Sequence, residues 1–466
     1  MEGVVSFAQR QAWAEQEFAQ AALGDRRRTL RLVKAAAQMA SNSSGSIPQQ
    51  AGNRADMKAI YRLFAEPDVT HQAVCAPHFA ATRAAASVRP LVFLIQDTTQ
   101  LNLTSHAACQ GLGPMGRGPL RGLHQQNVLA VTPDNRQPLG LLYQAHHRRA
   151  SRGAQHDRTA QRKVPLRRRE SYWWIEAIHA IGAVPSGSRW VHVGDRGEDL
   201  FGVYQACVAQ GADWLVRAAA NRNVQTPAGQ ARLFEYARQL PAQADKRLTV
   251  AGHGKRPPRA AQLQVAAARL RILPPKSEAV YRQHGPIDAW VVRVWEPDPP
   301  ARTKALEWIL LTSLECAAPA GMLFAAEGYA LRWIIEELHK SEKTGCQVEA
   351  RRLSAADRLE PLIGVLSILA VWLLRLKYAA RAAPEQPADE QFDAETVAVM
   401  GRYLQRPAAT LTVGQFWAGI GRLGGHMGRK CDGPIGWLRA WRGWQSFQLI
   451  LLGASLYAHA EEGKCG

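Results

Sequence analysis

The sequence predicts an α/β protein in which a mixed sheet with flanking helices carries a β-rich insertion and lies between two helical regions. Helical patterns dominate the first 70 residues and most of the chain after about residue 320, and strand patterns dominate the stretch between them. The composition, 47% hydrophobic and 21% charged, is that of a packed protein. At 466 residues the chain is long enough for two or three domains.

The N-terminal region is expected to begin with two helices that are separated at Gly24 and Asp25. Asp25 is the expected N-cap of the second helix, because short acidic side chains accept hydrogen bonds from free amides there. Basic side chains recur in this helix at i, i+4 and i+7, namely at Arg27, Arg31 and Lys34. The residues expected on the opposite face are Leu30, Val33 and Ala37. The stripe suits a DNA backbone and suits an ordinary solvated face equally well.

Two apolar runs predict buried strands that each end in an aspartate. Pro90–Gln96 is followed by Asp97, and Trp190–Gly194 is followed by Asp195. An aspartate at a strand end is more often a turn or cap residue than a ligand. The two positions are therefore candidates only.

Between these runs the sequence predicts a hairpin and a helix. Asn127–Val131 and Leu139–Tyr143 flank the turn sequence TPDNRQ, and the helical segment SYWWIEAIHAIGA follows. Aspartate-terminated strands with antiparallel strands between them are what an RNase H-like core provides, with its mixed five-stranded sheet and flanking helices. A cationic run around Arg148–Arg169 precedes the helix; it is either a solvated loop or, in a DNA enzyme, a contact to phosphates.

The second half of the chain changes from strands to helices. Residues from about 220 to 305 contain strand-like pieces broken by Gly and Pro, which predicts a β-rich insertion. Helices are expected at Met322–Lys343 and Pro361–Leu376. A linker at 379–391 precedes a helical C-terminal region with four tryptophans expected in its core, Trp417, Trp437, Trp441 and Trp444.

Charge and cysteine content indicate an intracellular protein with a polyanionic partner. Lys and Arg number 58 against 39 acids, a net charge of +19, which attracts nucleic acid. The seven cysteines are scattered without a CxxC pair, which favours a reducing compartment over a disulfide framework or zinc finger. The N-terminus lacks the pattern of a signal peptide, and Leu362–Leu374 is too short to span a bilayer and predicts a buried helix.

Four residues in YALRWIIEELHKSEK are spaced by 3, 4 and 7, so they share one face of the predicted helix. They are Tyr329, Arg332, Glu336 and Lys343. A carboxylate in line with an arginine, an amine and an aromatic ring suits a metal beside a phosphate chain. The alternative is an Arg332–Glu336 ion pair on a solvated face. Glu337, the rival carboxylate, lies about 100° round the helix.

This Tyr-x-x-Arg-x-x-x-Glu-x-x-x-x-x-x-Lys pattern resembles the signature of the insertion-sequence-four family of bacterial DDE transposases. The resemblance extends over AALGDRRRTLRLVKAAAQ, DTT, DR, WILLTS and RLGG. It implies that Asp97, Asp195 and Glu336 are the catalytic triad and bind two Mg²⁺ or Mn²⁺ ions. It also implies contacts to transposon-end DNA by the YREK residues Tyr329, Arg332 and Lys343, by Trp308, which stacks on a flipped base, and by Arg26, Arg27 and Arg31.

The same resemblance implies three domains: 1–70 for end binding, 71–376 for catalysis with the insertion, and 377–466 for dimerisation. The implied activity is cut-and-paste transposition: cleavage at inverted-repeat ends through a hairpin, then joining of 3′-hydroxyl ends to target DNA by a homodimer in a synaptic complex, in the bacterial cytoplasm. Two alternatives remain: an inactive or repurposed end-binding protein, and a metal-dependent nuclease of the same fold.

Overall fold

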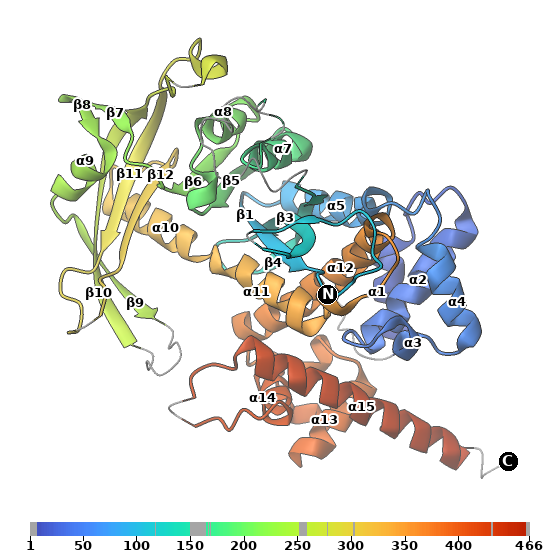
Figure 1. Ribbon diagram of the computed structural model, residues 1–466. Helices are drawn as coiled ribbons and strands as arrows, with labels where there is room; N and C mark the ends of the chain where they lie inside the picture. Colours follow the sequence, from blue (N-terminus) through green and yellow to red (C-terminus); the bar gives the residue numbers. More distant parts are fainter. Residues whose placement is uncertain are drawn as a thin grey trace.

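A computed structural model describes residues 7–116, 118–149, 165, 167, 169–250, 259–276, 278–301, 303–429 and 432–462. It is a mixed α/β structure with helical regions at both ends of the chain, as the sequence predicts (Figure 1). Most of the cationic run Arg148–Arg169 lies outside the described residues.

Five helices form the N-terminal region: α1 (Phe7–Phe18), α2 (Arg26–Ser41), α3 (Ile47–Gln50), α4 (Arg54–Leu63) and α5 (His71–Ser87). The predicted cap of α2 is confirmed, because the Asp25 side chain accepts a hydrogen bond from the amide of Arg27. The predicted position of Leu30 on the buried face is wrong, since this side chain is 60% exposed. Leu30 is three residues from Arg27 and four from Lys34, so it shares their side of the helix.

The central part of the sheet has five strands in the order β4-β3-β1-β5-β6. Their bounds are β1 (Leu91–Asn102), β3 (Arg121–Val131), β4 (Pro138–His147), β5 (Arg189–Gly194) and β6 (Asp213–Arg217). β3 is antiparallel to β1 and to β4, and β5 is parallel to β1 and to β6. The predicted β3–β4 hairpin is therefore confirmed, with longer strands than the apolar runs alone indicated.

The sheet does not stop at five strands, because β12 (Glu307–Thr312) pairs antiparallel with β6. The described residues form one 12-stranded sheet, in which β12 is followed by β11 (Ile287–Trp295), β10 (Arg259–Ile272), β7 (Asn223–Thr226) and β8 (Gly229–Arg232). β9 (Ala244–Val250) pairs with β10, and β2 (Gly113–Pro114) pairs with β3. The insertion also contains α9 (Leu233–Gln239). Pairing with β12 covers the open edge of β6, which would otherwise expose unpaired amides and carbonyls.

Helices cover the two faces of the central strands. On one face, α7 (Tyr172–Ile181) and α8 (Phe201–Ala209) form a core with β6, in which Trp174 and Tyr204 are buried near Trp214. On the other face lie α10 (Pro319–Ala330) and α11 (Trp333–Lys340), and the ring of Phe324 in α10 packs edge-on against Phe93 in β1. α11 is thereby brought against β1 (Figure 1).

Helix α12 (Ala356–Ala382) is the central helix of the molecule. By length and composition it resembles a membrane span, but 89% of its most apolar stretch is buried inside the protein. This confirms the prediction of a buried helix over Leu362–Leu374. The helix continues past residue 376 to Ala382, so the expected start of the C-terminal region at residue 377 falls inside it.

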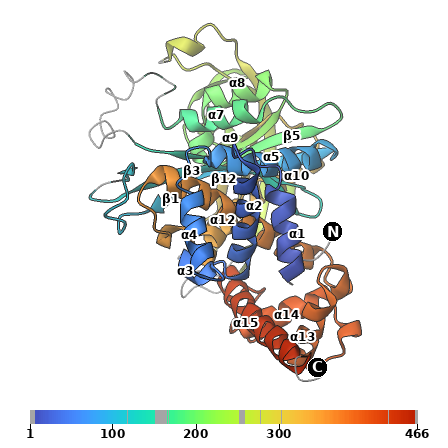
Figure 2. The same cartoon turned by 90° about the vertical axis from the view of Figure 1, so that its right-hand side faces the viewer.

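The C-terminal region consists of α13 (Ala394–Leu404), α14 (Val413–Leu423) and α15 (Trp437–Glu462). These helices lie below the sheet and the N-terminal helices in both views (Figures 1 and 2). Its four tryptophans are each 9% exposed or less, which confirms that they are core residues: Trp417, Trp437, Trp441 and Trp444. Short 3-10 helices lie at Arg196–Glu198, Ala279–Tyr281, Val348–Ala350, Ala388–Glu390 and Ala408–Thr410.

Candidate active site

The chain segment that carries Glu336 is not the single helix that the sequence predicts. Helix α10 ends at Ala330, α11 begins at Trp333, and a π-helical turn, Ser341–Gly345, follows α11. The amide of Arg332 bonds to the carbonyl of Tyr329, a tighter i, i+3 turn that interrupts the regular helix. The prediction of one face over four turns is therefore wrong, although Tyr329, Arg332 and Glu336 still interact electrostatically.

Asp97 lies in the middle of β1, not at the end of a strand as predicted. The strand continues to Asn102 because residues 98–102 keep their pairing with β3, and Asp97 itself is opposite Asn127. The apolar run ends at Ile95, but backbone pairing continues through the polar residues that follow. A strand predicted only from its run of apolar residues is therefore predicted to end too early.

Asp195 follows the last residue of β5, as predicted. Its Oδ1 accepts a hydrogen bond of 2.6 Å from the amide of Gly197 and so caps the 3-10 helix Arg196–Glu198. In the parallel register of β1 and β5, Ile95 is paired with Val193. Asp97 and Asp195 each follow this pair by two residues, so they lie at about the same level, Asp97 within β1 and Asp195 just past the end of β5.

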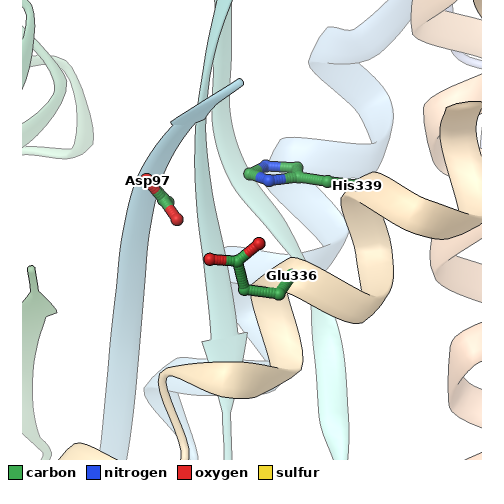
Figure 3. Close-up of side chains that lie close together, drawn as sticks. All are labelled: Asp97, Glu336 and His339. Carbon is green, nitrogen blue, oxygen red and sulfur yellow. The ribbon is translucent and has the colours of Figure 1, made fainter. Parts of the chain in front are cut away.

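Glu336 projects from α11 toward Asp97 (Figure 3). The guanidinium of Arg332 links them: Nη1 lies 2.9 Å from Oδ2 of Asp97, and Nη2 lies 3.3 Å from Oε1 of Glu336. Glu337 points elsewhere and forms an ion pair of 2.9 Å with Lys377 of α12. The rotation of about 100° between consecutive helical residues thus sends the two glutamates to different partners.

The three carboxylates lie close together in a half-buried place. The pKa of Asp97 is raised to about 7, mainly by burial; the charge of Arg332 opposes this rise, and the charges of Asp195 and Glu336 contribute to it. Three acids face one arginine, which leaves an excess of negative charge if all of them ionise. Hard oxygen ligands with uncompensated charge are what a divalent cation binds, so the residues present fit such an ion.

Two buried residues beside the carboxylates were missed in the sequence. His339, 6% exposed, forms with Asp97 and Glu336 a group whose ligand atoms all lie within 4.8 Å of one another (Figure 3). Asp195 is not part of that group. The signal was available, because His339 is three residues after Glu336 and so lies one turn along the helix.

Glu198 is the second missed residue. It is fully buried, and its pKa is raised well above the ordinary value by burial and by the charges of Asp195 and Asp97. A Cβ atom at Gly194 would lie 1.4 Å from its Oε2, so the glycine leaves room for this carboxyl beneath the strand. No sequence pattern indicates that a glutamate in a GED tripeptide is buried.

The family resemblance also assigns DNA contacts to Trp308, Tyr329 and Lys343. Trp308, half-buried on β12, contacts the buried ring of Tyr329 edge-on at a centroid distance of 5.3 Å. Lys343 lies in the π-helical turn and lines a groove of about 720 Å³ that also includes Arg352 and Arg442. Cationic side chains thus line a groove between the π-helical turn and α15.

The arginines near the N-terminus form a separate surface. Arg26, Arg27 and Arg31 are exposed on α2, and the structure does not bring them to the carboxylates. Arg27, with a side chain 90% exposed, pairs with Asp25 at 2.8 Å. Arg28, in contrast, is half-buried and forms ion pairs with Glu66 and Asp68.

Residues 10–69 match the family model of transposase DNA-binding domains. The match covers α2 together with its exposed arginines, and supports a transposase that binds DNA through its N-terminal helices. The exposed basic face of α2 therefore has a DNA-binding interpretation in addition to that of a solvated surface.

Proposed function

We propose that the protein is a DNA transposase of the DDE type that moves its element by cutting and pasting, as in the insertion-sequence-four family. The observation that carries the proposal is the meeting of Asp97 and Glu336 around Arg332, with Asp195 on the neighbouring strand. A second support is the match of residues 10–69 to the family model of transposase DNA-binding domains.

The strand order supports an RNase H-like catalytic core. The order is β4-β3-β1-β5-β6, with three antiparallel strands followed by two parallel ones. It places Asp97 on β1 and Asp195 just past the end of the adjacent strand β5. Helix α11 then crosses the same face and supplies the glutamate. The strands from β7 to β12 would be an insertion between the second aspartate and that helix.

We infer that Asp97, Asp195 and Glu336 together would hold two Mg²⁺ or Mn²⁺ ions, with Asp97 and Glu336 close enough to share one of them. Such a pair, when bound, activates the attacking oxygen and stabilises the leaving oxygen in phosphoryl transfer. The raised pKa of Asp97 supports this inference, because cation binding would offset the repulsion among buried carboxylates.

The remaining residues would position DNA. When cations bind to the carboxylates, the planar guanidinium of Arg332 would be released from them and could bind a DNA phosphate through two hydrogen bonds. Lys343 would hold a neighbouring phosphate, and Trp308, supported edge-on by Tyr329, would stack on a base turned out of the duplex. Arg26, Arg27 and Arg31 would grip the inverted repeat at the transposon end.

The proposed reaction starts with water attack at the transposon end, which releases a 3′-hydroxyl. That hydroxyl attacks the opposite strand to form a hairpin; a second water opens the hairpin, and the freed 3′-hydroxyl joins target DNA. Each step displaces one oxygen at phosphorus by another, so the same carboxylate cluster serves all four. No covalent protein–DNA intermediate is required.

A homodimer would hold the two transposon ends. Support comes from α15, on which several large apolar side chains are 38–72% exposed: Leu438, Leu449, Ile450 and Leu452. In a bacterial cell the protein would act on the nucleoid in the cytoplasm.

A strand-transfer assay tests the proposal. The full chain is incubated with Mg²⁺, target plasmid and DNA carrying the inverted repeats that flank its gene. Hairpin and insertion products that disappear in Glu336→Ala but persist in Arg358→Ala, an exposed control position, are the expected result. Nicking without insertion would indicate a nuclease, and DNA binding without metal-dependent cleavage would contradict both enzymatic functions.

A further inference from the structure

We propose that His339 supplies a nitrogen ligand to the cation that Asp97 and Glu336 hold, so that this half of the site is a mixed oxygen and nitrogen site. The inference rests on the proposed function only in placing a divalent cation between Asp97 and Glu336. His339 would be a fourth residue of the metal site, in addition to the three carboxylates, and it would affect which metal the site prefers.

The position of the imidazole is the first argument. His339 lies one turn after Glu336 on α11, and Asp97 faces both from β1 (Figure 3). One ligand atom from each of the three residues lies within 4.8 Å of the other two. Small side-chain rotations would bring all three atoms to about 2.0–2.2 Å from a single ion. At 6% exposure the ring is held in place by its surroundings.

The environment of the ring is the second argument. Nε2 of His339 lies 3.1 Å from Nδ2 of Asn127, the residue opposite Asp97 in the β1–β3 pairing. Because Nε2 is engaged with Asn127, Nδ1 is the nitrogen left for an ion. Ligand histidines almost always bind a polar group through their second ring nitrogen, which orients the ring.

Asn127 can support His339 with or without a cation. In the present arrangement Asn127 donates to Nε2, and its Oδ1 accepts a bond of 2.8 Å from Gln144. An ion on Nδ1 requires the proton on Nε2, which needs an acceptor. A 180° turn of the Asn127 amide presents Oδ1 instead, and the same turn in Gln144, which contacts His71 at 2.9 Å, restores the bond between Asn127 and Gln144. The long 3.4 Å bond from Gln125 to Asn127 is lost, but Gln125 keeps its bonds to Glu342.

The ligand set predicts a metal preference. Mg²⁺ favours oxygen ligands, whereas imidazole suits transition metals. A site with two carboxylates and one imidazole should therefore favour Mn²⁺ over Mg²⁺ more strongly than the carboxylates alone would. Replacing His339 by Gln keeps a polar side chain but removes the nitrogen ligand, so the preference for Mn²⁺ over Mg²⁺ should fall.

Pulsed electron paramagnetic resonance of Mn²⁺ bound to the full chain, without DNA, tests the assignment. The wild type should show modulation from a coordinated ¹⁴N nucleus, and this should change to the ¹⁵N pattern in protein labelled with ¹⁵N-histidine. The His339→Gln variant should lose the signal. His179→Gln, a change of an exposed histidine on α7, should keep it.

Bound Mn²⁺ with no histidine nitrogen coupling in the wild type would overturn the proposal, and so would coupling that survives His339→Gln. Isotope labelling needs no substitution, so the test holds even if the variant folds poorly. The outcomes also separate this inference from the proposed function. Nitrogen coupling to Mn²⁺ without DNA cleavage would contradict the transposase function but support His339 as a ligand. DNA cleavage without nitrogen coupling would support the function and contradict the ligand.

Discussion

The guanidinium of Arg332 lies 2.9 Å from the Asp97 carboxylate and 3.3 Å from that of Glu336, so one side chain partly neutralises two acids. Arg332 is therefore the counter-ion of both carboxylates. Its loss leaves like charges facing each other in a place where the Asp97 pKa is already raised to about 7.

Arg332→Gln should destabilise the cation-free protein by about 1–3 kcal/mol at pH 8, because two half-buried carboxylates lose their partner. Added Mn²⁺ should recover much of this loss, since a bound dication replaces the missing charge. Thermal unfolding with and without 1 mM Mn²⁺ measures both effects. Equal loss of stability in the two conditions would contradict the role of Arg332 as a substitute for the cation.

Glu336 and Glu337 should differ sharply when each is changed to Ala. Glu337→Ala leaves Lys377, 4% exposed, without its partner, and should cost about 3 kcal/mol in the free energy of unfolding. Glu336→Ala should cost less than about 1 kcal/mol and abolish metal-dependent cleavage. Urea denaturation and the cleavage assay, run on both variants at 20 °C, make the comparison.

The matched control removes both partners of the ion pair. Glu337→Leu combined with Lys377→Leu should recover most of the stability lost in Glu337→Ala, because no unpaired charge is then buried. A double variant as unstable as Glu337→Ala would show that packing, rather than charge, explains the loss.

Stability should fall as pH rises from about 5 to 7, with Glu342 as one cause. This buried carboxyl accepts hydrogen bonds from Gln125, and burial raises its pKa from 4.5 to about 7. The folded state thus holds its proton more tightly than the unfolded chain, and this advantage, about 3 kcal/mol, is lost as pH rises through the folded pKa.

Glu342→Gln, which resembles the protonated acid, should flatten this part of the pH profile. Denaturant unfolding of both proteins at pH 5, 6, 7 and 8 measures the difference between them. Asp97 contributes with the same sign to both proteins, so it cancels in the comparison. Parallel profiles for the two proteins would rule out Glu342 as a cause.

Arg31 and Arg28 should separate DNA binding from folding. Arg31→Ala, at an exposed position, should weaken binding to transposon-end DNA and reduce the slope of log K against log salt by about 1, with stability unchanged. Arg28→Ala breaks ion pairs with Glu66 and Asp68 and should lower the melting temperature without changing that slope. Fluorescence anisotropy at 50–200 mM salt distinguishes them, and an unchanged slope in Arg31→Ala would exclude a phosphate contact.

Local patterns in the sequence were enough to predict the α/β class, the β3–β4 hairpin, the cap at Asp25 and the buried helix α12. Each depends on neighbouring residues, because hydrophobic periodicity, turn residues and caps act over a few positions. The spacing of 100° per residue also separated Glu336 from Glu337, and the structure gives these two side chains different partners.

Tertiary structure alone decided what depends on contacts distant in the sequence. β1 runs past Asp97 because β3 pairs with it, the helix carrying Glu336 breaks at Leu331 and Arg332, and β12 joins the central sheet. His339 and Glu198 reach the carboxylates only because α11 and β5 pack beside β1. Local propensity cannot specify such positions, since burial and pairing with remote strands and helices determine them.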